Sequence, residues 1–205
     1  MEQGVLGYEL PSKSFLEIVA ARMKKLYDWK VNPDWIVYTA GVNNGYNIAA
    51  RFLCNSEKGY LIQTPVYNEF QETEHKTGVP QRTVRLEKKI SGNRISYEVD
   101  FEAFESEVKQ AGMFLLCHPH NPVGKVYSRS ELKRMAEICI ENNVTIVSDE
   151  IHSELLLGAA KFVPMASLSQ EIEQHTVTLI SASKAFNVPG LACAFAIIPD
   201  EKLRK

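Results

Sequence analysis

The sequence predicts an α/β fold built on a mainly parallel, seven-stranded sheet sandwiched by helices. Short apolar runs of strand length alternate along the chain with longer stretches of helical periodicity. Several short runs are apolar throughout, which is typical of strands buried on both faces of a sheet. The chain has 205 residues, of which 45% are hydrophobic, enough for one large domain with a sizeable core. We therefore expect a single layered domain over residues 1–205.

Seven segments supply the predicted strands. Each is short and rich in apolar or β-branched residues, and they are 35–39, 60–63, 82–86, 113–117, 144–148, 177–180 and 192–198. The polar segment 87–97 carries Gly92 and Asn93 at its centre, which predicts a hairpin or turn there. In such a sheet, ligands bind beyond the carboxyl ends of the strands, so the residues that follow these runs are the candidates for function.

The predicted helices lie between the strands and would cover both faces of the sheet. Their segments are 14–26, the stretch from the turn at 40–45 to residue 52, 68–76, 100–110 and 128–141. Ser14 and Glu17 have the spacing of a capping box for the first helix. Asp100 and Ser128 stand where N-cap residues are expected.

Composition and charge argue against several classes of protein. The net charge is −2 and no basic stripe is present, so nucleic acid is not an expected partner. No apolar run reaches the ~18 residues of a membrane span, and the N-terminus lacks the pattern of a secretory signal. Four cysteines are scattered among apolar neighbours, namely Cys54, Cys117, Cys139 and Cys193. They favour reduced core residues of a cytoplasmic protein over disulfides or zinc ligands.

Lys184 is the first candidate for chemistry. It follows the apolar run 177–180 and stands among the small residues Ser181, Ala182 and Ser183. A strand would lift its amine out of the sheet into a partly dry pocket, where a lysine can lose its proton and condense with an aldehyde. The same pattern also fits an ordinary exposed lysine that follows a strand, so other segments of the sequence are needed to distinguish the two interpretations.

Asp149 and Asn121 lie in those segments. Asp149 directly follows a buried strand, so its carboxylate needs a cationic or hydrogen-bonding partner, and a protonated ring nitrogen would serve. A helix cap or a metal ligand is the alternative, although Glu150 and His152 are too local in sequence to complete a metal cage. Pro122 keeps Asn121 out of the helical region, so its amide can donate to a phenolate-type oxygen or form an Asx turn.

Two further groups complete the pattern. The turn that contains Val42 and Asn43 precedes a helix, and its backbone N–H groups suit a phosphate, with the hydroxyls of Ser181 and Ser183 as additional donors. Tyr67 can offer a flat face to an aromatic ring, or it can be a packed core residue. An amine, a carboxylate, an amide, an anion site and a stacking ring are together the complements of pyridoxal 5'-phosphate (PLP).

These motifs resemble the large domain of fold-type I PLP enzymes of the aspartate aminotransferase superfamily. Residues 121–124, 149–150 and 181–184 occur in the order of that family. The chain is most similar to the cystathionine β-lyase (C–S lyase) branch, because His152 stands where typical aminotransferases have tyrosine. Ala192 stands where they carry an arginine for the cofactor phosphate.

The resemblance implies roles for the residues around the cofactor ring. Lys184 would be the catalytic residue, attaching PLP and later taking the proton from the substrate's Cα. Asp149 would pair with the ring nitrogen, and Asn121 would bind the ring oxygen with help from His152.

The remaining implied contacts are made with the rest of the cofactor. Tyr67 would stack on the ring, while Val42, Asn43 and Ser181 would hold the phosphate. Tyr8 is similar to a tyrosine that family dimers donate to the neighbouring active site, so a homodimer is expected.

The resemblance also implies a function. We expect β-elimination from cystathionine or cysteine-like amino acids, which gives pyruvate, ammonia and a thiol. An aminotransferase of the same fold is the first alternative, and an inactive fragment or non-catalytic binding module is the second. The family is about twice this length, so residues 1–205 would be a large domain with a shortened N-terminal arm and without the small C-terminal domain. Such a piece is expected to bind PLP weakly and turn over little, because the arginine that holds the substrate carboxylate is absent.

Overall fold

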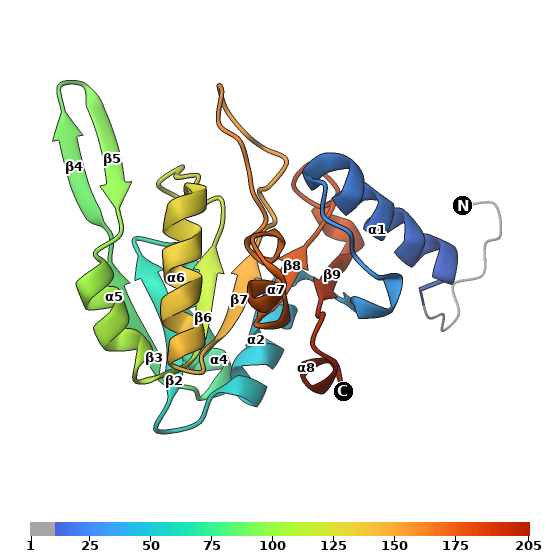
Figure 1. The fold of residues 1–205 in the computed structure, drawn as a ribbon, viewed down its shortest axis with the longest axis horizontal. Coiled ribbons are helices and arrows are strands. Elements are labelled where there is room, and N and C mark those ends of the chain that lie inside the picture. The colour runs from blue at the N-terminus through green and yellow to red at the C-terminus, as the bar shows by residue number, and fades with distance from the viewer. Residues whose placement is uncertain (1–10) are drawn as a thin grey trace.

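The computed structural model describes residues 11–205 and shows a central sheet with helices on both faces (Figure 1). The sheet has seven strands in the order β1-β9-β8-β7-β6-β2-β3. Their bounds are β1 Ile36–Thr39, β2 Gly59–Thr64, β3 Gln81–Arg85, β6 Ala111–Cys117, β7 Thr145–Asp149, β8 Thr176–Ile180 and β9 Ala194–Ile197. Strands β3, β2, β6, β7 and β8 run parallel, whereas β9 is antiparallel to both β8 and β1. The predicted α/β fold with a mainly parallel sheet is confirmed.

A separate hairpin stands away from this body. Strands β4 (Glu87–Ser91) and β5 (Arg94–Glu98) pair only with each other in an antiparallel ladder, and they project from one end of the sheet (Figure 1). Gly92 has a φ of 57°, in the left-handed region that glycine adopts readily. The hairpin predicted at this position is confirmed.

The five predicted helices form, one of them as two short helices, and the short helices α7 and α8 are present although the sequence analysis did not predict them. Their bounds are α1 Lys13–Tyr27, α2 Val42–Leu53, α3 Asn68–Gln71, α4 Thr73–Thr77, α5 Phe101–Val108, α6 Arg129–Glu141, α7 Gln170–Gln174 and α8 Glu201–Arg204. The capping box predicted at Ser14 is wrong, because Ser12 is the N-cap and its hydroxyl accepts the Phe15 N–H. The helix predicted over 68–76 is divided at Glu72 into α3 and α4.

The two remaining predicted caps are present. Asp100 accepts the Ala103 N–H at the start of α5. Ser128 and Glu131 form a reciprocal capping box at the start of α6. Three short 3-10 turns complete the structure at Pro33–Trp35, Met165–Ser167 and Pro189–Leu191.

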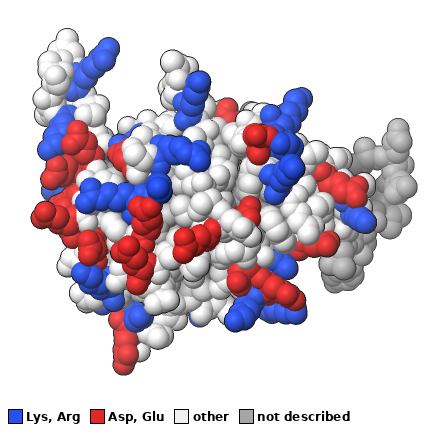
Figure 2. All heavy atoms as spheres, viewed as in Figure 1, with Lys and Arg blue, Asp and Glu red and all other residues white. Residues whose placement is uncertain are grey.

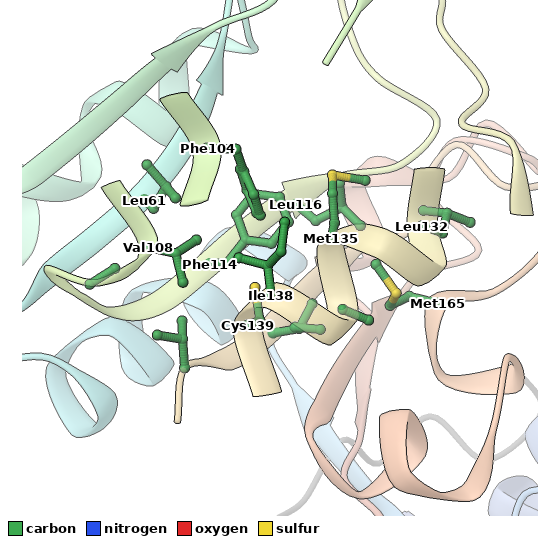
Figure 3. Packing of buried hydrophobic residues seen from close by; sticks show 14 of the residues in the cluster. Leu61, Phe104, Val108, Phe114, Leu116, Leu132, Met135, Ile138, Cys139 and Met165 are labelled. Carbon is green, nitrogen blue, oxygen red and sulfur yellow. The ribbon is translucent and has the colours of Figure 1, made fainter. Parts of the chain in front are cut away.

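Three apolar clusters hold the helices on the sheet. One face is covered by α5 and α6, where Phe104, Phe114, Leu116 and Met135 interdigitate (Figure 3). The other face is covered by α2 and α3, and α1 packs at the β9–β1 end. Burial of such side chains contributes roughly 1.5–3 kcal/mol each, so the sheet is a firm platform for the loops at its edge.

The register of the central strands brings distant residues to one edge. Cys117 at the end of β6 is paired with Asp149 at the end of β7, and Asp149 is paired with Leu179 near the end of β8. The loops that follow these strands therefore emerge side by side, as the sequence predicts for a ligand site.

The charge on the visible face and the apolar character of the helices can be stated for the described residues. Positive and negative side chains alternate over the face seen in Figure 2, and no single-sign patch dominates it. Within residues 11–205, no helix combines the length and the apolar character that a bilayer crossing requires.

Candidate functional site

A cavity of about 360 Å³ opens at the carboxyl ends of the strands. Every predicted site residue that the structure describes lines it: Val42, Asn43, Tyr67, Asn121, Asp149, His152, Ser181 and Lys184. Tyr8 lies outside the described residues. The cavity is also lined by residues that the sequence did not single out, including Cys117, Ile151 and Pro189. No three His, Cys, Asp or Glu side chains within residues 11–205 gather as metal ligands would.

Asp149 ends β7 and presents its carboxylate to the floor of the cavity. The residue is 6% exposed, and its Oδ1 accepts a hydrogen bond of 3.1 Å from the Ile151 N–H. Burial raises the pKa of this carboxyl to about 7, while that hydrogen bond and the charge of Lys184 act in the opposite direction. A carboxyl held this way is suited to a cationic partner that enters the cavity.

Lys184 lies on the loop of residues 181–193, which we call the lysine loop. This loop follows β8 and contributes Ser181, Lys184 and Ala192 to the cavity lining. The expectation of a partly dry amine is wrong for this structure, because Lys184 is exposed. The reason is local: β8 ends at Ile180, and the lysine loop runs over the surface in turns and a 3-10 helix.

The start of α2 forms another wall. Its N-cap is Gly41, with a φ of 111° and no side chain to cap the helix, so the first backbone N–H groups lack a side-chain acceptor. Val42 and Asn43 in this first turn line the cavity. They belong to a helix of twelve residues, whose dipole adds partial positive charge at this end. The arrangement suits an anion.

Ser181 occupies the predicted place but is already engaged. Its hydroxyl donates to the Cys193 carbonyl at 2.7 Å and accepts the Ser183 N–H at 3.0 Å. To donate to a bound phosphate, its single O–H has to leave Cys193. Ser183, the second hydroxyl donor expected from the sequence, lines the same cavity.

Asn121 and Tyr67 come from the loops after β6 and β2. The Asn121 N–H donates to the Cys117 sulfur at 3.4 Å, and its side-chain amide has no hydrogen-bond partner within residues 11–205. Tyr67 precedes α3, is 37% exposed and meets the Phe70 ring edge-on. Both side chains are therefore available to a ligand in the cavity.

His152 lies in the turn after β7 at the junction of two cavities. It is half-buried, and burial together with the nearby Lys184 charge lowers the pKa of its imidazole. The adjoining cavity, of about 270 Å³, shares Asn121 and His152 with the first and is otherwise largely apolar, with Val126 and Leu157 in its lining.

Glu150 illustrates what sequence reasoning missed near the site. It is 2% exposed and lies next to Asp149, yet it does not line the cavity. It accepts hydrogen bonds of 2.9 Å from the Ser148 hydroxyl and from the Met165 N–H. Burial raises the pKa of Glu150 to about 8. Strand alternation turns it away from the cavity, so its role is to join β7 to the segment before α7.

The chain is similar to proteins of known family. The family model described as aminotransferase class I and II matches residues 6–205. The chain is 35% identical over 206 residues to cystathionine beta-lyase PatB of Bacillus subtilis, covering 100% of this chain and 52% of that protein. It therefore spans about half the length of the curated relatives it matches.

Solved structures agree in fold. Cystalysin from Treponema denticola, whose crystal structure contains a pyridoxal 5'-phosphate cofactor, superposes with a TM-score of 0.93 at 30% identity, over 99% of this chain and 51% of that one. The PLP-bound C-S lyase from Staphylococcus hominis gives a TM-score of 0.90 at 28% identity, over 98% of this chain and 51% of that one.

Proposed function

Because the chain belongs to the class I and II aminotransferase family of fold-type I PLP enzymes, we propose that its cavity binds pyridoxal 5'-phosphate. We further propose that the protein containing it catalyses β-elimination from cysteine-type amino acids with a substituted sulfur, such as cystathionine. The single observation that carries this proposal is the meeting of Asp149, Lys184 and the uncapped start of α2 around one cavity.

The residues present fit that cofactor. The uncapped first turn of α2, with Val42 and Asn43, suits the phosphate. Asp149 is a carboxyl whose pKa is raised by burial, and a protonated pyridine nitrogen beside it would stabilise its ionised form. Asn121 and Tyr67 have side chains free to bind the ring oxygen and to stack on the ring. When bound, PLP supplies an electron sink for negative charge that develops at the substrate's Cα.

Asp149 and Lys184 would have different roles in the reaction. Asp149, ionised beside the cationic ring nitrogen, would hold that nitrogen in its protonated form. Lys184 would anchor the cofactor and, once released by the substrate amine, would take the proton from Cα as general base. Its place on an exposed loop gives the side chain room for both tasks. Departure of the β-sulfur completes the elimination, and water converts the remaining three-carbon unit to pyruvate and ammonia.

The lyase is favoured over an aminotransferase by two positions. His152 lines the cavity where the aminotransferase pattern has tyrosine, and Ala192 lines it where that pattern has arginine. The adjoining cavity is lined largely by apolar residues, so it suits the carbon chain of a sulfur substituent. These observations support elimination, while an aminotransferase remains the alternative function.

Two measurements test the proposal. The first is release of pyruvate from cystathionine with no 2-oxo acid added, which β-elimination predicts. Amino transfer to an added 2-oxo acid without pyruvate release would instead establish the aminotransferase. The second is borohydride reduction followed by peptide mapping, in which the PLP adduct should lie on Lys184. An adduct elsewhere, or none, would refute the cofactor assignment.

We also propose that the protein works as a homodimer in the cytoplasm. On α2, the apolar side chains of Ile48 and Phe52 are 54% and 85% exposed and lie one turn apart on the same helix face. Such a face suits a second copy. The four cysteines are unpaired, which fits a reducing compartment. Sedimentation at two protein concentrations tests the dimer, and a monomer at both would exclude it.

A further inference from the structure

A row of buried hydrogen bonds includes His120, which lines the adjoining cavity. The Tyr127 hydroxyl is 3.0 Å from Oε1 of Gln63 and 2.9 Å from Nδ1 of His120. Nε2 of His120 is 2.9 Å from the carbonyl oxygen of Pro65. The side chains of the row belong to residues that are 2% exposed or less. Buried polar groups need partners, so the hydrogens in this row can be assigned one by one.

The direction of the row follows from Pro65. A carbonyl oxygen only accepts, so Nε2 of His120 must carry a hydrogen. Burial lowers the pKa of His120 to about 4, so the imidazole is neutral near pH 7 and its Nδ1 is an acceptor. Tyr127 must therefore give its single hydrogen to Nδ1. The opposite tautomer would set two acceptors against each other at Pro65.

Gln63 must then be a donor. Its Nε2 is buried without a partner in the part of the chain that the structure describes, while its Oε1 faces the Tyr127 hydroxyl. A half-turn of the terminal amide exchanges these two atoms and directs the NH₂ group to Tyr127. It also leaves an unpaired carbonyl oxygen instead of an unpaired N–H group, which buried sites tolerate better. Donors then follow one another from Gln63 through Tyr127 and His120 to Pro65.

This row joins two loops of the cavity. Pro65 lies two residues before Tyr67, and His120 directly precedes Asn121. The backbone holds the second loop as well, because the His120 N–H donates to the Lys125 carbonyl at 2.8 Å. No other side chain in the described structure hydrogen-bonds the Pro65 carbonyl to the loop after β6.

We propose that His120 is a positioning residue for the cofactor ring: together with Tyr127 and Gln63, it fixes the loop that carries Tyr67 against the loop that carries Asn121. This inference rests on the proposed binding of PLP by the same cavity. Stacking and hydrogen bonding to one ring require the two side chains to keep their separation to within ~0.5 Å, and the row supplies that constraint.

The first experiment needs no cofactor. Nitrogen-15 spectra of the histidine rings should show His120 as the Nε2–H tautomer, unchanged between about pH 5.5 and 8.5. His120→Leu should shift the ring signals of Tyr67. The matched control is His118→Leu, on the same loop and equally buried, which bonds the Val163 carbonyl instead and should leave Tyr67 unchanged. An Nδ1–H tautomer, or equal shifts in both variants, would overturn the proposal.

The second experiment uses the PLP-bound protein. The pH midpoint of the visible absorbance change of bound PLP should move in His120→Leu in the same direction as in Asn121→Ala. The double variant should move it no further than Asn121→Ala alone, because both changes act through one contact. Tyr127→Phe, which removes only the hydroxyl, should give a smaller shift and serves if His120→Leu does not fold.

The two proposals fail in different ways. A protein that shows no visible absorbance of bound PLP would refute the proposed function, while the cofactor-free spectra would still decide the role of His120. A bound PLP whose midpoint moves in Asn121→Ala but not in His120→Leu or Tyr127→Phe would overturn the positioning role alone. Additive shifts in the double variant would do the same.

Discussion

The two sides of the cavity differ in how firmly the protein holds them. On the strand-end side, Asp149 and His120 are buried, and hydrogen bonds tie them to the sheet and its loops. On the other side, the lysine loop runs over the surface, with Lys184 exposed and Phe186 56% exposed. The comparison indicates that the buried side of the cavity sets the electrostatic environment, whereas the proposed reactant, the amine of Lys184, lies on the exposed side where its long side chain has room to move.

The largest expected effect comes from removing that amine. Lys184→Ala should lower β-elimination by at least about 10³-fold, because it removes both the anchor and the general base. The free energy of unfolding should stay the same within about 0.5 kcal/mol, since the side chain is exposed. Pyruvate release and denaturant unfolding measure the two quantities.

A control lysine sharpens this first prediction. Lys133 on α6 is also exposed and pairs with Glu137 on the same helix. Lys133→Ala should leave β-elimination unchanged. A Lys184→Ala protein that keeps more than a tenth of the activity would contradict the proposed role of Lys184 as anchor and general base.

The next largest effect concerns Asp149, on the buried side of the cavity. Asp149→Asn should lower β-elimination by about 10²–10³-fold, because the cationic ring nitrogen loses its charged partner. Without cofactor, the same change should not lower stability at pH 8, since it removes a buried charge that burial disfavours. Steady-state rates and unfolding of the cofactor-free protein test both parts, and a loss of stability with unchanged rate would contradict the assignment.

The titrating groups on the buried side of the cavity predict a pH dependence of stability. The folded-state pKa values of Asp149 and Glu150 are raised to about 7 and about 8, so folded protein binds protons that unfolded protein lacks, and stability falls as pH rises. His118 and His120 have pKa values lowered to about 4, so their contribution rises with pH up to about 6.5.

These opposing effects give a defined profile. Below about pH 6.5, the stabilising contribution of the two carboxyls falls with pH while that of the two imidazoles rises, so the two contributions offset each other. Between about pH 6.5 and 8, only the carboxyls still change the free energy of unfolding. The free energy of unfolding of the cofactor-free protein should therefore fall by about 1–3 kcal/mol over that interval. Glu150→Gln should flatten the fall. A profile that rises there would show that these carboxyls are not buried as described.

The smallest effect concerns the tether of the lysine loop. Arg22 on α1 hydrogen-bonds Glu154 through Nε at 3.0 Å and lies 5.1 Å from the centre of the Phe186 ring. Arg22→Met should lower stability by less than about 1 kcal/mol but should speed proteolytic cleavage within the lysine loop. Lys24→Met, which breaks an exposed ion pair with Asp28 on the same helix, is the control and should leave cleavage unchanged.

The sequence predicts the features of this site that depend on neighbouring residues, but not those that depend on contacts between distant segments. Asp149 could be placed because an apolar run ends just before it, and the strand register does the rest. The exposure of Lys184 could not, because it depends on the course of the lysine loop and not on the residues next to it. The row through His120 joins residues up to 64 positions apart, and no periodicity signals such a contact. Ser12 and Ser14 show the limit for caps, because both carry the hydroxyl and only the backbone geometry selects one.

The antiparallel strand β9 has a consequence for how this protein is made. The edge strand β1 pairs with β9 alone, although nearly the whole chain separates them, and α2 begins just after β1. During synthesis, β1 cannot pair in the sheet until β9 has emerged from the ribosome. The turn before α2, which we propose binds phosphate, can therefore take its final place only after β9 has been made, so PLP would be captured by a sheet in which all seven strands are present.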